Sequence, residues 1–295
     1  MVKGMMTPAK EAAYKKALEL ALDSGYEALE NGKSAVDAVE IAVKAMEDSS
    51  LFNAGKGSVF TADETHEMDA SIMEGKELNA GAVSLISGIK NPVSLARDVM
   101  DNSEHVFLAA DGAMKFAKSI GYKTLNPDYF YDQLRHDQWV EIKDTDSFQL
   151  DHSVKKDSKF GTVGAVACDS EGNIAAATST GGMTNKRFGR IGDSPMIGAG
   201  NYANNDTCAV SCTGSGEYFI RGVVAYDVAC LIEYKGYSLK QAADEVINKR
   251  ILKIGGDGGL IAVNAKGDIA MPFNTEGMYR GCRNSEGLKE IKIYS

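Results

Sequence analysis

The chain has 295 residues, 44% of them hydrophobic and 25% charged, proportions typical of a globular protein. The formal net charge of −9 argues against nucleic-acid binding, because phosphate contacts need a surplus of lysine and arginine. No apolar run approaches the roughly 20 residues that span a bilayer, so we expect no membrane contact.

The cysteines and histidines indicate neither a disulfide framework nor a metal site. Five cysteines are few and odd in number, as in proteins of a reducing compartment. His66 and Glu67 begin like a zinc-protease motif, but Ala70 stands where the second histidine would be. The start of the chain lacks the apolar stretch of a secretory signal. We therefore expect a cytoplasmic protein that needs no cofactor for catalysis.

The first half of the sequence predicts helices around a short strand pair. Helical spacing of apolar residues, with caps or breakers at the ends, predicts four helices: residues 9–29, residues 34–46, a segment from Pro92, and residues 104–119. A glycine-rich loop at residues 53–58 precedes two predicted strands, at residues 66–73 and 80–87.

The second half follows a polar, charged and irregular stretch. Such a stretch inside a compact protein is usually functional or disordered, and we predict a flexible linker over about residues 122–161. Apolar runs bounded by turn residues then predict strands at 162–168, 174–179, 207–212, 260–263, 268–272 and 288–294, and helices at 217–234 and 238–249. Helices that flank buried strands indicate a layered α/β architecture.

Thr162 opens a strand directly after the linker and after Gly161. Cutting this one peptide bond would expose a threonine with both a hydroxyl nucleophile and an α-amine. The amine has an ordinary pKa of about 7.7–8.0, so it can accept the hydroxyl proton near neutral pH. No catalytic histidine would be needed, and the sequence contains no G-x-S-x-G elbow. Alone, a Gly-Thr pair is an ordinary turn.

The segments around this pair resemble the plant-type asparaginase and isoaspartyl peptidase family of N-terminal nucleophile hydrolases. The resemblance covers nearly the whole chain in the expected order, and six segments carry it: LFNAG (51–55), GTVGAVA (161–167), GNIAAATSTGGMTNK (172–186), GRIGDSP (189–195), SCTGSGE (211–217) and FNTEGM (273–278). It implies a four-layer αββα sandwich. Residues 1–161 and 162–295 would be the α and β subunits of one globular domain after self-cleavage.

The resemblance implies how the nucleophile works. Thr162 would be freed by cleavage after Gly161, and Thr180 would hydrogen-bond near it and position it. Thr213 and Gly214 would form the oxyanion hole, where loss of one donor costs about 10²–10³ in rate. Without the family, Thr180 would be an ordinary strand-end hydroxyl and the pair at 213–214 an ordinary glycine turn.

The resemblance also implies a substrate. Arg190 would hold the α-carboxylate of an aspartyl unit, a task suited to a planar, permanently charged fork. Asp193 would hold the α-ammonium, with help from the carbonyl of Gly216, while Thr213 and Gly214 contact the reacting group. The purely structural alternative for Arg190 and Asp193 is a solvated ion pair that contributes under about 1 kcal/mol to stability.

In the implied reaction, the enzyme cleaves L-asparagine or a β-aspartyl dipeptide and releases aspartate through a β-aspartyl ester on Thr162. The family also suggests a dimer of processed α/β pairs. A loop that holds a structural sodium ion through backbone carbonyls would comprise Leu51, Phe52, Asn53, Ala54, Gly55 and Lys56. The alternative for this loop is a plain tight turn.

One departure from the family pattern concerns the start of the chain. The family normally begins with a buried strand and a His-Gly-Gly-Ala-Gly type segment, whereas this sequence goes straight into its first helix. We expect the fold to lack that strand, with unpaired edges and a hole in the core as the consequence. A true start further upstream would also allow a periplasmic or secreted location.

Two other functions stay open at this point. A glycosylasparaginase-type hydrolase would also use Thr162, although such proteins resemble secreted, disulfide-bearing ones. An unprocessed, truncated relative could serve as a binding or assembly module without catalysis.

Overall fold

The computed structural model describes residues 6–145 and 161–294. Its first helices begin where capping residues predict them. The Thr7 hydroxyl accepts a hydrogen bond from the Lys10 N–H, and the Ser34 hydroxyl accepts one from the Asp37 N–H. The helices of this half are α1 (Pro8–Glu30), α2 (Ala35–Glu47), α3 (Pro92–Asn102), α4 (Ala110–Ser119) and α5 (Gln133–Val140).

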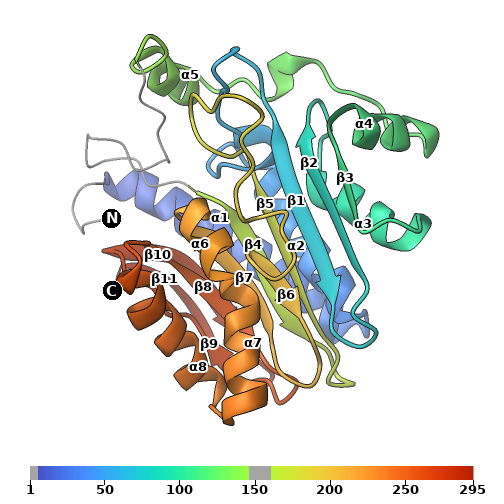
Figure 1. Cartoon of the computed structure of the whole chain (residues 1–295), viewed down its shortest axis with the longest axis vertical. Coiled ribbons are helices and arrows are strands. Elements are labelled where there is room, and N and C mark those ends of the chain that lie inside the picture. Colours follow the sequence, from blue (N-terminus) through green and yellow to red (C-terminus); the bar gives the residue numbers. More distant parts are fainter. Residues whose placement is uncertain (1–5, 146–160, 295) are drawn as a thin grey trace.

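Five strands form one sheet in the order β3-β2-β1-β5-β4. β1 pairs antiparallel with β5, so strands from before and after Gly161 lie side by side in the same sheet (Figure 1). All residues of β5 are buried, as its apolar and small residues predict. The strands are β1 (Met68–Glu74), β2 (Ala80–Ile86), β3 (Phe107–Ala109), β4 (Val163–Cys168) and β5 (Ile174–Thr180).

A second, antiparallel sheet has the order β6-β7-β8-β9, and a separate hairpin pairs β10 with β11. β10 was not predicted, because its two glycines and two arginines lower its strand propensity. Tyr279 of β10 stacks on Tyr14 of α1, with ring centroids 4.8 Å apart. These strands are β6 (Asn201–Ala203), β7 (Ala209–Gly214), β8 (Gly258–Val263), β9 (Ile269–Ala270), β10 (Gly277–Arg283) and β11 (Lys289–Tyr294).

Three helical predictions need correction. Residues 107–109 of the predicted helix 104–119 are strand β3, because they pair in parallel with β2. The predicted helix 217–234 is broken at Val223, whose φ of 46° is left-handed, into α6 (Gly216–Gly222) and α7 (Val224–Lys235). The helix predicted at 238–249 becomes a π-helical turn (Val246–Ile251) after α8 (Leu239–Glu245).

The stretch predicted as an irregular linker is ordered over part of its length. It contains the 3₁₀ turn Pro127–Tyr129 and helix α5, and Asp132 caps the helix by accepting a hydrogen bond from the Arg135 N–H. Trp139 of α5 is buried beside Phe60, with ring centroids 6.2 Å apart. Tertiary burial of aromatic side chains thus outweighs the polar composition. The rest of the predicted linker, residues 146–160, lies outside the described residues.

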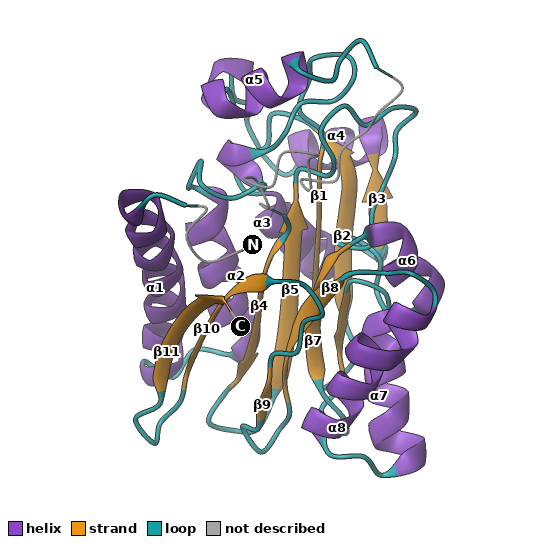
Figure 2. Cartoon of the chain, turned by 90° about the vertical axis from the view of Figure 1, so that its left-hand side faces the viewer, coloured by secondary structure: helices purple, strands orange, loops and turns teal. Residues whose placement is uncertain are grey.

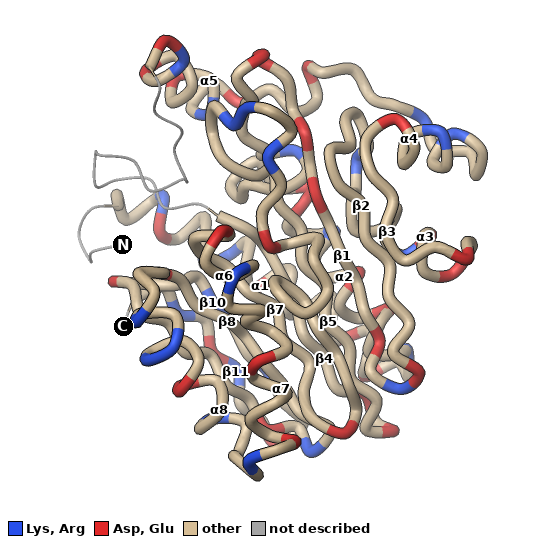
Figure 3. Tube along the Cα trace, viewed as in Figure 1, with Lys and Arg blue, Asp and Glu red and all other residues tan. Residues whose placement is uncertain are grey.

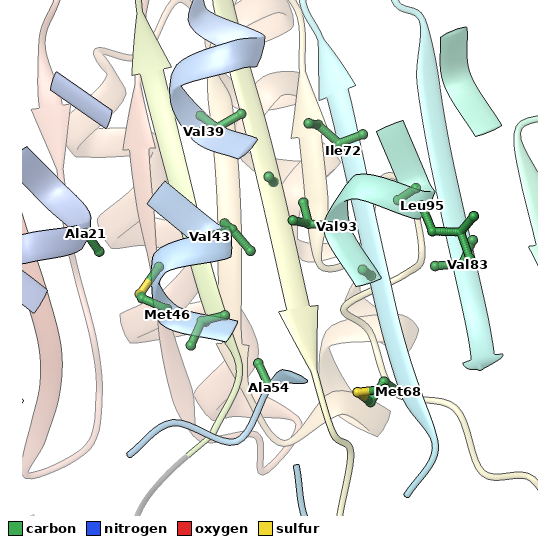
Figure 4. Close-up of a cluster of buried hydrophobic side chains, with 14 of the residues drawn as sticks. Ala21, Val39, Val43, Met46, Ala54, Met68, Ile72, Val83, Val93 and Leu95 are labelled. Atoms are coloured by element: carbon green, nitrogen blue, oxygen red, sulfur yellow. The ribbon is translucent and has the colours of Figure 1, made fainter. Parts of the chain in front are cut away.

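The helices cover the outer faces of the two sheets (Figure 2). α2 packs on β4 and β5, and α3 packs on β1 and β2, while α7 and α8 contact β7 and β9. Between them, β4 and β5 face β7. Figure 4 shows one core, in which Val39, Val43 and Met46 of α2 point toward the strands. The predicted mixed α/β class is confirmed. None of the described helices is long and apolar enough to cross a membrane.

Candidate active site

Thr162 lies immediately before β4, at the end of the five-stranded sheet. Val163 is the register partner of Ser179 in β5, so the next position brings Thr162 opposite Thr180. Thr180 is buried, and its hydroxyl accepts a hydrogen bond of 3.1 Å from the Gly182 N–H. The two threonines that the sequence singled out therefore lie opposite each other at the ends of neighbouring strands.

Ser194 is a contact of Thr162 that sequence reasoning missed. Its hydroxyl oxygen lies 3.2 Å from Thr162 Oγ1, and the residue is buried. The Ser194 carbonyl accepts a hydrogen bond of 2.6 Å from the Ser71 hydroxyl in β1, which fixes the loop. The signal was its place directly after Asp193 in the GRIGDSP segment.

Thr213 and Gly214 end β7 beside the same peptide. A Cβ atom on Gly161 would lie 3.3 Å from Thr213 Oγ1, so the hydroxyl faces the predicted cleavage site. Gly214 has a φ of 154°, and a Cβ atom there would lie 2.4 Å from the Asp257 carbonyl oxygen. Only glycine fits this position, because a side chain would collide with the backbone of the neighbouring segment.

Arg190 and Asp193 converge on Gly216 at the start of α6. A Cβ atom at Gly216 would lie 3.0 Å both from Arg190 Nη2 and from Asp193 Oδ1. The guanidinium of Arg190 also donates two hydrogen bonds to Glu217, from Nε to Oε1 at 2.8 Å and from Nη2 to Oε2 at 2.9 Å. Sequence reasoning missed Glu217, although it closes the SCTGSGE segment.

Charged residues lie mainly on helices, loops and turns (Figure 3). Asp193, in the loop between β5 and β6, is buried. Burial raises the pKa of its carboxyl group to about 7, although the nearby Arg190 guanidinium opposes the rise. Its Oδ2 atom is buried and makes no hydrogen bond to the described part of the chain. Burial alone would raise the pKa of Glu217, but the hydrogen bonds and charge of Arg190 outweigh it and lower that pKa.

The loop predicted to hold sodium supports the strand end that carries Thr180. Asn53 donates a hydrogen bond of 2.7 Å to the Gly182 carbonyl and accepts one of 3.1 Å from the Val59 N–H. Its own carbonyl accepts a hydrogen bond from the Gly181 N–H at 2.9 Å. The end of β5 and this loop are thus joined by backbone and side-chain contacts.

Backbone carbonyl oxygens also lie close to two glycines of this loop. A Cβ atom on Gly57 would lie 2.1 Å from the Phe52 carbonyl oxygen and 2.7 Å from that of Ser50. One on Gly55 would lie 2.5 Å from the Glu47 carbonyl oxygen. Hard cations such as sodium prefer oxygen ligands of this kind. Within the described ranges, no cluster of histidine, cysteine and acidic side chains could hold a metal ion.

A cavity of about 710 Å³ joins these residues. It extends between β4 and β10 and is bounded by apolar side chains of α1 and α2. Within residues 6–145 and 161–294, β4 pairs only with β5, and β10 pairs only with β11. All the residues predicted to react or to bind substrate line it: Gly161, Thr162, Thr180, Arg190, Asp193, Thr213, Gly214 and Gly216.

Comparison with known proteins agrees with this geometry. The sequence profile of a family described as asparaginase matches residues 1–293. The chain belongs to the asparaginase family. Isoaspartyl peptidase of Escherichia coli K12 is 50% identical over 281 residues, which cover 94% of this chain and 88% of that protein.

Eukaryotic members of the asparaginase family are similar over comparable lengths. The probable isoaspartyl peptidase/L-asparaginase 2 of Arabidopsis thaliana is 42% identical, across 95% of this chain and 92% of its own. The human isoaspartyl peptidase/L-asparaginase is 44% identical, across 86% of this chain and 81% of its own. The family resemblance predicted from the sequence segments is confirmed.

Proposed function

We propose that the chain is a self-processing threonine amidohydrolase that releases L-aspartate from L-asparagine and β-aspartyl dipeptides. The observation that carries the proposal is one cavity that combines Thr162 with a cation, Arg190, and a buried carboxyl group, Asp193. An aspartyl unit has a carboxylate and an ammonium group that match this pair. The names of the similar proteins support the same substrates.

Self-cleavage would come first. The Thr162 hydroxyl attacks the Gly161 carbonyl carbon, the peptide nitrogen leaves as the new α-amine, and water hydrolyses the resulting ester. Ser194 lies within hydrogen-bonding distance of the attacking oxygen. The Thr213 hydroxyl faces the same peptide and would stabilise the negative charge that develops on the Gly161 carbonyl oxygen.

Substrate hydrolysis would follow in the same place. Arg190 holds the α-carboxylate, and Asp193, helped by the Gly216 carbonyl, holds the α-ammonium. Thr162 attacks the side-chain carbonyl while its own amine takes the hydroxyl proton, and the oxyanion rests on Thr213 and Gly214. Ammonia or an amino acid leaves, and water then releases aspartate from the ester on Thr162.

The finer architecture is part of this proposal. Helices contact one sheet, that sheet contacts the second sheet, and further helices contact the second sheet. This succession of layers supports an αββα sandwich of the N-terminal nucleophile hydrolase type. Residues 1–161 and 162–295 would be its α and β subunits. Among the described residues β4 is an edge strand, and this edge and the cavity beside it support the prediction that the fold lacks the family's first strand. We also propose a dimer of processed α/β pairs in the cytoplasm, without nucleic-acid or membrane partners.

The backbone carbonyl oxygens near Gly55 and Gly57 are the basis on which we propose a bound sodium ion. The backbone of the loop from Leu51 to Lys56, with the Glu47 carbonyl, would hold it and stiffen the support beneath Thr180. The ion would be structural, so catalysis needs no cofactor.

The function is tested by aspartate release from purified protein given asparagine, a β-aspartyl dipeptide or a glycosylated asparagine. We expect the first two to react and the Thr162→Ala variant to be inactive on all three. Reaction of the glycosylated substrate alone would indicate a glycosylasparaginase. If no substrate reacts with a cleaved sample, the proposal is wrong.

A further inference from the structure

The Arg190 side chain has a partner within the protein, Glu217. Its Nε and Nη2 atoms donate to the two carboxylate oxygens of Glu217, at 2.8 and 2.9 Å. This two-bond geometry is the strongest that a guanidinium makes with a carboxylate. Glu217 therefore occupies one of the two edges through which Arg190 can bind a carboxylate in bidentate fashion.

Nη1, which belongs only to the other edge of the guanidinium, lies beside Gly192, and Nη2, which the two edges share, lies beside Gly216. A Cβ atom on Gly192 would lie 3.0 Å from Nη1, and one on Gly216 would lie 3.0 Å from Nη2. Any larger residue at either position would crowd this edge. Both glycines line the cavity together with Arg190, whereas Glu217 is outside its lining. The edge turned away from Glu217 is thus the one available to a ligand.

Glu217 comes from a different element than the side chain it holds. It lies in the first turn of α6, directly after Gly216, while Arg190 belongs to the loop after β5. The Arg190 side chain is 19% exposed and that of Glu217 is 51% exposed. An isolated ion pair with this exposure contributes little to the stability of the fold. Its effect is therefore to orient the Arg190 guanidinium.

We propose that Glu217 is a positioning residue, which fixes the guanidinium of Arg190 so that its Nη1–Nη2 edge meets the α-carboxylate of the substrate. The inference rests on the proposed function, because it assigns the carboxylate to Arg190. A free arginine side chain has many rotamers. The two hydrogen bonds from Arg190 to Glu217, which we call the clamp, remove that freedom before substrate binds. Substrate then adds to the open edge without displacing Glu217.

This arrangement predicts which substrates depend on Glu217. A substrate with a free α-carboxylate uses the oriented edge and gains from the clamp. A substrate whose α-carboxylate is converted to a carboxamide cannot make two charge-assisted bonds there, so it gains little. Chemistry at Thr162 is unaffected, since Glu217 does not contact the reacting atoms in the described structure.

The test compares processed wild-type protein with Glu217→Ala and Glu217→Gln on two substrates. One is a β-aspartyl dipeptide, and the other is the same dipeptide with the α-carboxylate of its aspartyl residue converted to a carboxamide. For the free carboxylate we expect Glu217→Ala to raise KM about tenfold, with kcat within about threefold of wild type. Glu217→Gln keeps one acceptor oxygen, so its KM should lie between that of wild type and that of Glu217→Ala. For the carboxamide, KM should change by less than about twofold.

The matched control is Asp227→Ala, which removes the Arg250 partner on α7 and should leave both KM values unchanged. Circular dichroism and melting temperature would show that the Glu217 variants fold. An unchanged KM for the free carboxylate, an equal rise for both substrates, or a fall in kcat alone would overturn the inference. Wild-type protein inactive on both substrates would contradict the proposed function and, with it, any substrate on Arg190.

Discussion

At the scale of single residues, Asp193 carries the most distinctive chemistry of the cavity. It is buried, one of its oxygens makes no hydrogen bond to the described residues, and its pKa is raised to about 7. An ammonium group placed against that oxygen would favour the ionised carboxylate. Substrate binding and the ionisation of Asp193 are therefore linked.

The linkage predicts a pH dependence of KM. Below pH 7 the free enzyme carries a protonated Asp193, which must lose its proton before it holds the substrate ammonium. KM for a β-aspartyl dipeptide should therefore fall by about tenfold as pH rises from 6 to 8, with most of the fall below pH 7. Steady-state kinetics across this range measures it.

Asp193→Asn provides the control for this prediction. Its KM should be high and should lack the slope near pH 7, because the amide does not titrate. A wild-type KM that stays constant from pH 6 to 8 would contradict the assignment of the ammonium to Asp193. The α-amine that the proposed cleavage would free on Thr162 has an ordinary pKa of about 7.7–8.0, and it would affect kcat instead because it would act in the chemical step.

At the scale of elements, local signals predicted what depends on nearby residues. The Ser34 cap and the buried run of β5 gave boundaries within a few residues. Helix α5 and strand β3 could not be predicted, because aromatic burial and pairing with β2 decide them. The left-handed Val223 that breaks a helix is equally a tertiary feature.

The site shows the same division. The residues in family segments were predicted by number, and the structure brings them around one cavity. Glu217 and Ser194 were missed although they belong to the same segments, because contact between side chains depends on how loops fold together. The support that Asn53 gives to the end of β5 is also visible only in three dimensions.

That support yields a prediction for the loop. Asn53→Ala leaves the Gly182 carbonyl and the Val59 N–H without their partners in a buried region. We expect the free energy of unfolding to fall by about 3 kcal/mol, together with a loss of kcat as Thr180 shifts. Urea denaturation and aspartate release would measure the two effects.

Asn284→Ala is the control, because Asn284 makes similar side-chain bonds in the exposed turn between β10 and β11. It should cost less than about 1 kcal/mol and leave kcat unchanged. If Asn53→Ala changes the free energy of unfolding and kcat no more than this control does, the loop does not support the end of β5 that carries Thr180.

At the scale of the whole molecule, the sheet joins the parts of the chain on either side of Gly161. β1 lies between β2 and β5, so cutting the Gly161–Thr162 bond leaves both fragments in one sheet. The six antiparallel residue pairs between β1 and β5 would hold the fragments together after cleavage. Cleavage can therefore free Thr162 without separating the cavity from its walls.

The mass of the intact purified protein tests the central claim most directly. Wild-type protein should give two fragments that meet at Gly161 and Thr162 and migrate together under native conditions, while Thr162→Ala should give one full-length chain. A wild-type chain that remains whole after long incubation would contradict the claim that Thr162 is freed as an N-terminal nucleophile.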